Sequence, residues 1–100
     1  MVKIKIDLNN PDFQNDFFNL EKQEQTALIK TLKNICQLEW QTLYMHRGLR
    51  WELISSKKTS DGNAVYSFRF SQKYRALASR DSEFLRILSL HVDHDSAYKA

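Results

Sequence analysis

The chain has 100 residues, of which 42% are hydrophobic and 27% charged, with a net charge of +3. These values fit one compact domain over residues 1–100, and no apolar run approaches the ~20 residues that a membrane helix needs. The alternating N-terminus with its early acidic residue excludes a signal peptide, and the single cysteine, Cys36, excludes an internal disulfide and is typical of a cytoplasmic protein.

The first part of the chain predicts a strand followed by a helical hairpin. Apolar and polar residues alternate over residues 2–8, which is typical of a half-buried strand. Asn10 is a good helix N-cap and Pro11 suits a first helical position, so a helix is expected over residues 11–20. Apolar residues at helical spacing predict a second helix over residues 22–38.

The second part predicts a short helix and then an antiparallel sheet. The stretch "EWQTLYMHRG" favours a third helix, with Gly48 as its C-terminal cap. Period-two patterns separated by turn residues then predict the sheet segments 49–56, 64–71 and 74–92. Helices segregated on one face of such a sheet define an α+β fold, in which an N-terminal strand and a helical hairpin pack on a mostly antiparallel sheet.

Positive charge is concentrated in the second part of the chain. Residues 1–40 hold five Lys and six Asp or Glu. Residues 41–100 hold ten Lys or Arg, among them all six arginines of the chain, and six Asp or Glu. The planar guanidinium group suits phosphate and carboxylate groups equally well. A nucleic acid or an acidic peptide is therefore a candidate partner, and a basic surface that serves solubility is the alternative.

The hairpin "YSFRFSQKYRALASR" carries three cations within seven residues. Alternation places Arg69 and Ser71 on one face, with Lys73 in the turn and Arg75 at the start of the return strand. If the cations converge, they form a cradle for a phosphate group, in which an arginine can stabilise a developing phosphorane charge. The alternative is that these strand arginines point into solvent.

The C-terminal stretch "HVDHDSAYK" is rich in titratable side chains. Strand alternation predicts two faces, one with Ser89, His91 and Asp93 and the other with Leu88, Leu90 and Val92. Imidazole titrates near neutrality and can move protons, and Asp93 could orient it. The alternatives are a structural histidine, or a metal site that also uses His94 and Asp95. A metal is disfavoured because strand geometry turns His94 away from His91 and no second ligand cluster exists.

Three further residue patterns bear on function. A hydrolase triad and a phosphate-binding glycine loop are disfavoured, because the only glycines are Gly48 and Gly62. Trp40, Tyr44 and Trp51 could stack on bases, but we expect them to close the core between the third helix and the sheet. Tyr98 differs from them because it is an aromatic residue in a polar tail. No cofactor is expected.

With these features the chain resembles, over almost its whole length, the RelE/ParE toxin superfamily of bacterial toxin–antitoxin modules. The resemblance is carried by the order of elements and by the motifs "GLRWELI", "YSFRFSQKYRALASR" and "LRILSLHVDHDSAYK". It implies a small cytoplasmic toxin that cuts mRNA on translating ribosomes and that an acidic antitoxin protein inhibits.

The resemblance also implies roles for individual residues. Arg75 matches the arginine that stabilises the scissile phosphate, and Arg69 matches a basic residue that helps to bind RNA. His91 falls near the polar residue that ends the central strand, and Tyr98 matches a tyrosine that stacks on a base or assists proton transfer. Together with the residues themselves, this predicts catalytic side chains at Arg75, His91 and Tyr98. It predicts substrate-binding side chains at Arg69, Lys73 and His94.

Two other functions remain open at the level of the sequence. One is a topoisomerase poison of the same fold, which binds a protein and needs no acid or base. The other is an inactive basic binding module. The oligomeric state is not specified by the sequence.

Overall fold

The computed structural model describes residues 3–92, so residues 1–2 and 93–100 lie outside the description that follows. The elements in chain order are β1 (Lys5–Asp7), α1 (Pro11–Asn19), α2 (Lys22–Ile35), α3 (Trp40–Met45), β2 (Glu52–Lys58), β3 (Ala64–Arg69), β4 (Tyr74–Asp81) and β5 (Phe84–Val92). No helix in this range is long and apolar enough to cross a membrane.

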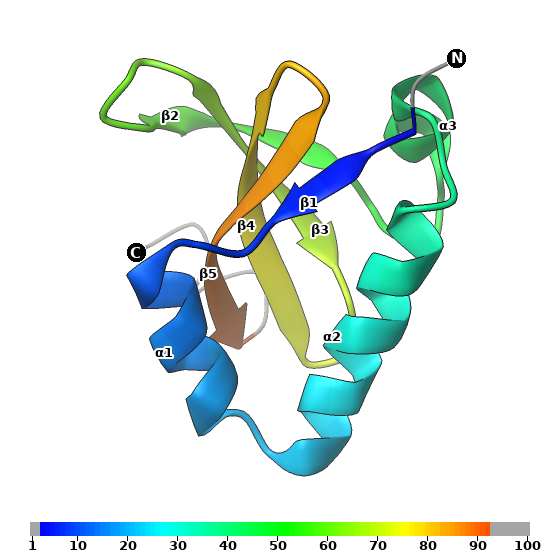
Figure 1. Cartoon of the computed structure of the whole chain (residues 1–100), viewed down its shortest axis with the longest axis vertical. Coiled ribbons are helices and arrows are strands. Elements are labelled where there is room, and N and C mark those ends of the chain that lie inside the picture. The colour runs from blue at the N-terminus through cyan, green and yellow to red at the C-terminus, as the bar shows by residue number, and fades with distance from the viewer. Residues whose placement is uncertain (1–2, 93–100) are drawn as a thin grey trace.

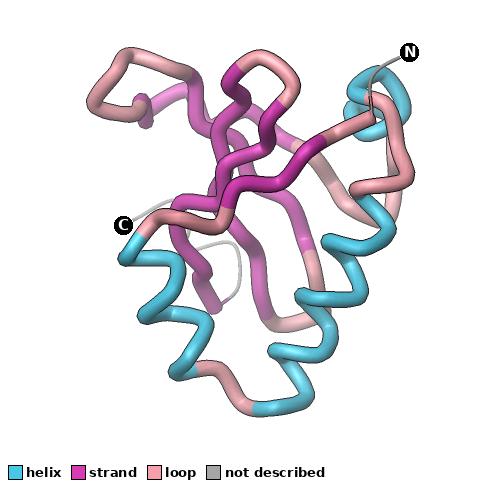
Figure 2. Tube along the Cα trace, in the orientation of Figure 1, coloured by secondary structure: helices cyan, strands magenta, loops and turns pink. Residues whose placement is uncertain are grey.

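The strands form one five-stranded mixed sheet in the order β1-β5-β4-β3-β2. Strand β1 runs parallel to β5, and the other neighbours are antiparallel. Helices α1 and α2 form a V-shaped hairpin at one end of the molecule (Figures 1 and 2). The predicted α+β fold with a mostly antiparallel sheet is therefore confirmed.

The local signals at the start of α1 act as expected. The Asn10 side-chain oxygen accepts hydrogen bonds from the backbone N–H groups of Asp12 at 2.8 Å and Phe13 at 3.3 Å, and Pro11 begins the helix. This cap satisfies N–H groups that have no partner inside the helix. Helix α2 ends at Ile35, three residues before the predicted end at residue 38.

The main core lies between the helices and one face of the sheet. Its largest fully buried side chains come from both layers, namely Leu28, Ile35, Leu43, Phe68, Leu85 and Ile87. Trp51 contacts Trp40 and Tyr44, with ring centroids 6.2 and 5.9 Å apart. Trp51 also stacks on Tyr66 and Phe68 of β3, so the cluster joins α3 to the sheet. Trp40 is buried in the core as predicted, whereas Tyr44 is 42% exposed.

Two expectations about the segment after α3 are wrong. Gly48 does not cap the helix, because α3 already ends at Met45, where His46 leaves the helical conformation with φ −75° and ψ 110°. The next strand begins at Glu52 rather than at residue 49, and it continues to Lys58. Arg50 has φ 50°, which is incompatible with an extended strand.

The predicted face of Leu88 is also wrong. Strand β5 has an irregular register, in which Leu77 lies opposite Ser89 and Ala78 lies opposite Ile87. One extra residue, Leu88, is therefore accommodated as a bulge, which reverses the alternation at that point. Leu88 packs on the face away from the main core, in a second small cluster with Ile54, Val65 and Leu77.

Candidate functional site: a polar row on the outer face of the sheet

The sheet face opposite the main core, here called the outer face, carries three of the predicted site residues in one line. Arg69 of β3 lies opposite Arg75 of β4, and Arg75 lies opposite His91 of β5. Residues paired in this way have Cβ atoms about 4.5–5.5 Å apart. The register therefore brings Arg69, Arg75 and His91 together in what we call the polar row.

Arg75 is held firmly in the middle of the polar row. Its side-chain Nη2 donates hydrogen bonds to Ser67 Oγ at 2.7 Å and to the Arg50 carbonyl oxygen at 3.1 Å. The same nitrogen lies 3.7 Å from a carboxylate oxygen of Glu52. Arg75 is only 4% exposed. Its guanidinium group is therefore a fixed positive charge beneath the surface, not a flexible arm.

The Nε atom of Arg75 distinguishes this arginine further. It is buried and has no hydrogen-bond partner within residues 3–92. A buried donor without a partner costs free energy, typically about 1–3 kcal/mol. The burial of this atom also means that its N–H is not open to solvent.

His91 ends the polar row in a half-buried position. Its Nε2 lies 2.8 Å from Ser89 Oγ, at hydrogen-bonding distance. Burial lowers the pKa of His91 below its ordinary value of 6.5; the nearby Lys57 lowers it further, and Asp16 partly opposes the shift. The imidazole is therefore mainly neutral at pH 7 and able to accept a proton.

Asp16 also holds α1 against the edge of β5. One of its carboxylate oxygens accepts a hydrogen bond from the backbone N–H of Leu90 at 2.9 Å. Strand β1 pairs only with the first part of β5, up to Arg86. Asp16 thus replaces a strand partner beside His91 and fixes the position of the end of β5.

Arg69 and Lys73 are more accessible than Arg75. Arg69 is half-buried, and its guanidinium group makes no hydrogen bond or ion pair within the described residues. Lys73 is exposed in the turn between β3 and β4, where Ser71 Oγ accepts its backbone N–H at 3.3 Å. Lys73 therefore lies beyond the polar row. His94 and Tyr98 lie outside the described residues, and so does Asp93.

Two pockets adjoin the polar row. A pocket of about 510 Å³ lies on the outer face, where Ser89 forms part of its wall and Lys57 and Lys58 lie along its rim. A second pocket, of about 630 Å³, includes Arg69. Both lysines lie between the predicted sheet segments 49–56 and 64–71, whereas β2 continues to Lys58. The pairing of β2 with β3 sets Lys58 opposite Ala64, and both lysines line the outer-face pocket together with Ser89.

The arrangement can stabilise and move charge without a bound ion. It offers a neutral imidazole, a fixed guanidinium group and a second, accessible guanidinium group. Within residues 3–92, no three His, Cys, Asp or Glu side chains gather closely enough to hold a metal ion. This donor set suits an anionic substrate such as a phosphodiester.

Comparison with known proteins identifies no family. No family model matches the sequence, and no curated protein does so either. Among solved structures, the chain is similar to a copper-bound mutant toxin from Helicobacter pylori, with 13% sequence identity and a TM-score of 0.46. The similarity covers 92% of this chain and 94% of the toxin.

Proposed function

We propose that the chain is a toxin that cleaves RNA by metal-free transesterification. The polar row of Arg69, Arg75 and His91 is the observation that carries this proposal. In this reaction the 2′-oxygen of the substrate bonds to the adjacent phosphorus, and the bond from phosphorus to the 5′-oxygen breaks. The products are a 2′,3′-cyclic phosphate and a 5′-hydroxyl group.

Each step needs a group that the site can supply. Neutral His91 removes the proton from the 2′-hydroxyl group, which makes the attacking oxygen a stronger nucleophile. The leaving 5′-oxygen takes a proton from Tyr98, a role based on the sequence resemblance alone. Exchange with water then returns both side chains to their starting states.

The two arginines divide the work of binding and stabilisation. Arg75, held by Ser67 and the Arg50 carbonyl, supplies a fixed positive charge next to the phosphorane. Arg69 has no internal partner among the described residues and contacts the phosphate directly. Lys73 and His94 are assigned to binding of the RNA backbone, His94 on the basis of the sequence alone.

The biological setting rests on the sequence resemblance and on charge. We assign the substrate as mRNA on the ribosome and the inhibitor as an acidic antitoxin protein. The net charge of residues 41–100 is +4, which complements both partners. Purification from the native host should recover a small acidic protein with the chain, and the antitoxin assignment fails if no protein partner is recovered.

A second function is favoured by the burial of Arg75. The 4% exposure of Arg75 and its bond to Ser67 also fit an arginine whose role is to stabilise the fold. The outer face would then be a binding surface without chemistry, as in a topoisomerase poison or an inactive basic module.

Primer extension on mRNA from reconstituted ribosomes separates these functions. The wild-type chain should produce discrete cleavage sites, and His91→Ala should lose them. Lys30→Ala, which changes an exposed residue of α2 away from the polar row, is the control and should cleave normally. Growth arrest without any cleavage would reject the nuclease and favour the topoisomerase poison.

A further inference from the structure

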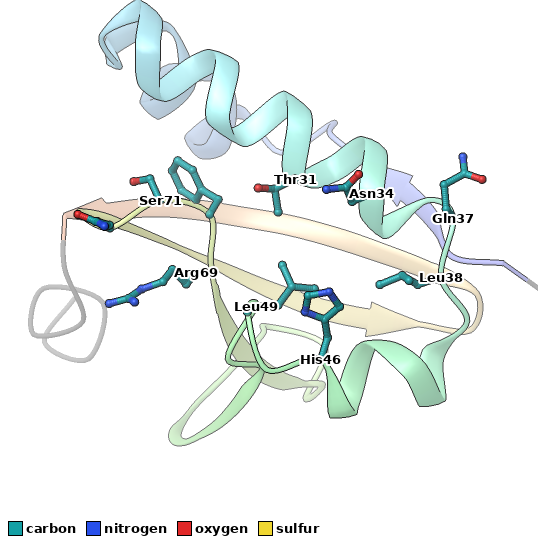
Figure 3. Close-up of a pocket in the computed structure, with 11 residues that line it drawn as sticks. Thr31, Asn34, Gln37, Leu38, His46, Leu49, Arg69 and Ser71 are labelled. Carbon is teal, nitrogen blue, oxygen red and sulfur yellow. The ribbon is translucent and has the colours of Figure 1, made fainter.

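A second pocket opens beside the polar row and is not used by the chemistry described above. It lies between α2, the segment that joins α3 to β2, and the end of β3 with the turn that follows (Figure 3). Its volume of about 630 Å³ is in the range of ligand sites, about 300–1,000 Å³. Arg69 belongs both to this pocket and to the polar row. A ligand at Arg69 can therefore reach both places.

Opposite walls of the pocket supply polar groups. Thr31 and Asn34 come from α2, and the ring of His46 faces them from the segment after α3 (Figure 3). Within the described part of the chain, the side chains of these three residues make no hydrogen bond. Among residues 3–92, no acidic residue lines the pocket. The described part of the site therefore offers unused donors and acceptors without a repelling negative charge.

The remaining surface of the pocket is partly apolar. Leu38, Leu49 and Phe70 contribute to it. Apolar groups beside a few polar ones suit a flat heterocycle, which buries its faces and forms hydrogen bonds along its edge. The Asn34 amide has a donor next to an acceptor, and asparagine uses this pair to bind the edges of bases.

The direction of Arg69 links such a heterocycle to a phosphate. In Figure 3 its guanidinium group points away from the middle of the pocket, away from His46 and Leu49. A phosphate at Arg69 would therefore lie at the rim, next to the polar row. We propose that this pocket binds a nucleobase of the RNA whose phosphate lies at Arg69. The inference takes its RNA context from the proposed function and adds a base-binding subsite to it.

Direct binding of nucleotides tests the subsite without relying on cleavage. Isotope-labelled full-length protein is titrated with AMP, GMP, CMP and UMP, and with inorganic phosphate, while NMR follows the Asn34 side-chain amide and the backbone signals of Thr31 and His46. At least one nucleotide should shift these signals, and phosphate should leave them unchanged. Asn34→Ala should weaken the binding of that nucleotide about tenfold. Asn15→Ala, the same change on an exposed site of α1, should have no effect.

The outcomes separate the subsite from the proposed function. If phosphate reproduces every nucleotide-induced shift, or if no nucleotide shifts the Asn34 amide, the base-binding inference is rejected even when the protein cleaves RNA. Nucleotide binding that is sensitive to Asn34→Ala supports the subsite even when no cleavage occurs, in which case the nuclease proposal alone fails. In a cleaving protein, Asn34→Ala should also reduce base preference at the cut sites, and an unchanged preference contradicts the inference.

Discussion

At the scale of single residues, His91 determines how activity should depend on pH. Burial lowers its pKa below 6.5, so the base form is present at neutral pH and is lost only in more acidic solution. For the proposed RNA cleavage, kcat/KM should therefore rise through a pKa below 6.5 and then level off. His91→Ala should lower the rate by about 10²–10⁴-fold. A pH–rate profile measures both effects, and an unchanged acidic limb in the variant would exclude His91 as the base.

Arg75 should link activity to stability. Arg75→Ala removes the hydrogen bonds to Ser67 and the Arg50 carbonyl, and bonds to a charged group contribute about 1.5–3 kcal/mol. The free energy of unfolding should fall by about that amount, and cleavage should fall about a hundredfold or more. The sequence alone predicted only the loss of activity, because it did not show that Arg75 is buried.

Comparing Ser67→Ala with Arg75→Ala distinguishes a catalytic role of Arg75 from a structural one. Ser67→Ala keeps the guanidinium charge but removes its shortest hydrogen bond, of 2.7 Å. Urea denaturation and primer extension should be measured on both variants. If Arg75→Ala is destabilised but cleaves as fast as the wild type, Arg75 is structural, and the binding function without chemistry is favoured.

At the scale of elements, the helices and strands were largely predictable and their register was not. Asn10 and Pro11 mark the start of α1 through local hydrogen bonding, which depends only on neighbouring residues. The bulge at Leu88 and the positive φ of Arg50 depend on distant packing, so no local pattern revealed them. The hairpin motif identified Arg75 as a candidate, but its bond to Ser67 depends on how β3 pairs with β4.

The pairing of β1 with β5 should depend on an ion pair at the sheet edge. An Asp7 carboxylate oxygen accepts a hydrogen bond from Arg86 Nε at 2.9 Å. The pKa of Asp7 is lowered, first by the hydrogen bond from the Asn9 backbone and then by Arg86. Because the folded state thus favours the carboxylate, Asp7 contributes stability above its unfolded pKa near 3.8, and this contribution is lost as the pH falls through the lowered value.

Asp7→Asn tests that contribution. The variant should lose about 1 kcal/mol at pH 7, since the pair is only partly buried, and the difference from wild type should shrink in strongly acidic solution. Chemical denaturation at a series of pH values measures the difference. The carboxylate is not responsible if the two proteins differ by the same amount at every pH.

At the scale of the whole molecule, the distribution of charge should control affinity for RNA. Binding of a single strand releases counterions, and the slope of log K against log salt is about −0.7 for each phosphate that is neutralised. Lys58 is exposed and lines the outer-face pocket. Lys58→Ala should therefore weaken the binding of a non-cleavable RNA oligonucleotide and reduce the slope by about 0.7.

Lys30→Ala, on α2, removes the same charge from another surface and should leave the slope unchanged. Fluorescence anisotropy over a range of salt concentrations measures the slopes, and equal effects of the two substitutions would mean that net charge, and not the outer face, attracts the RNA.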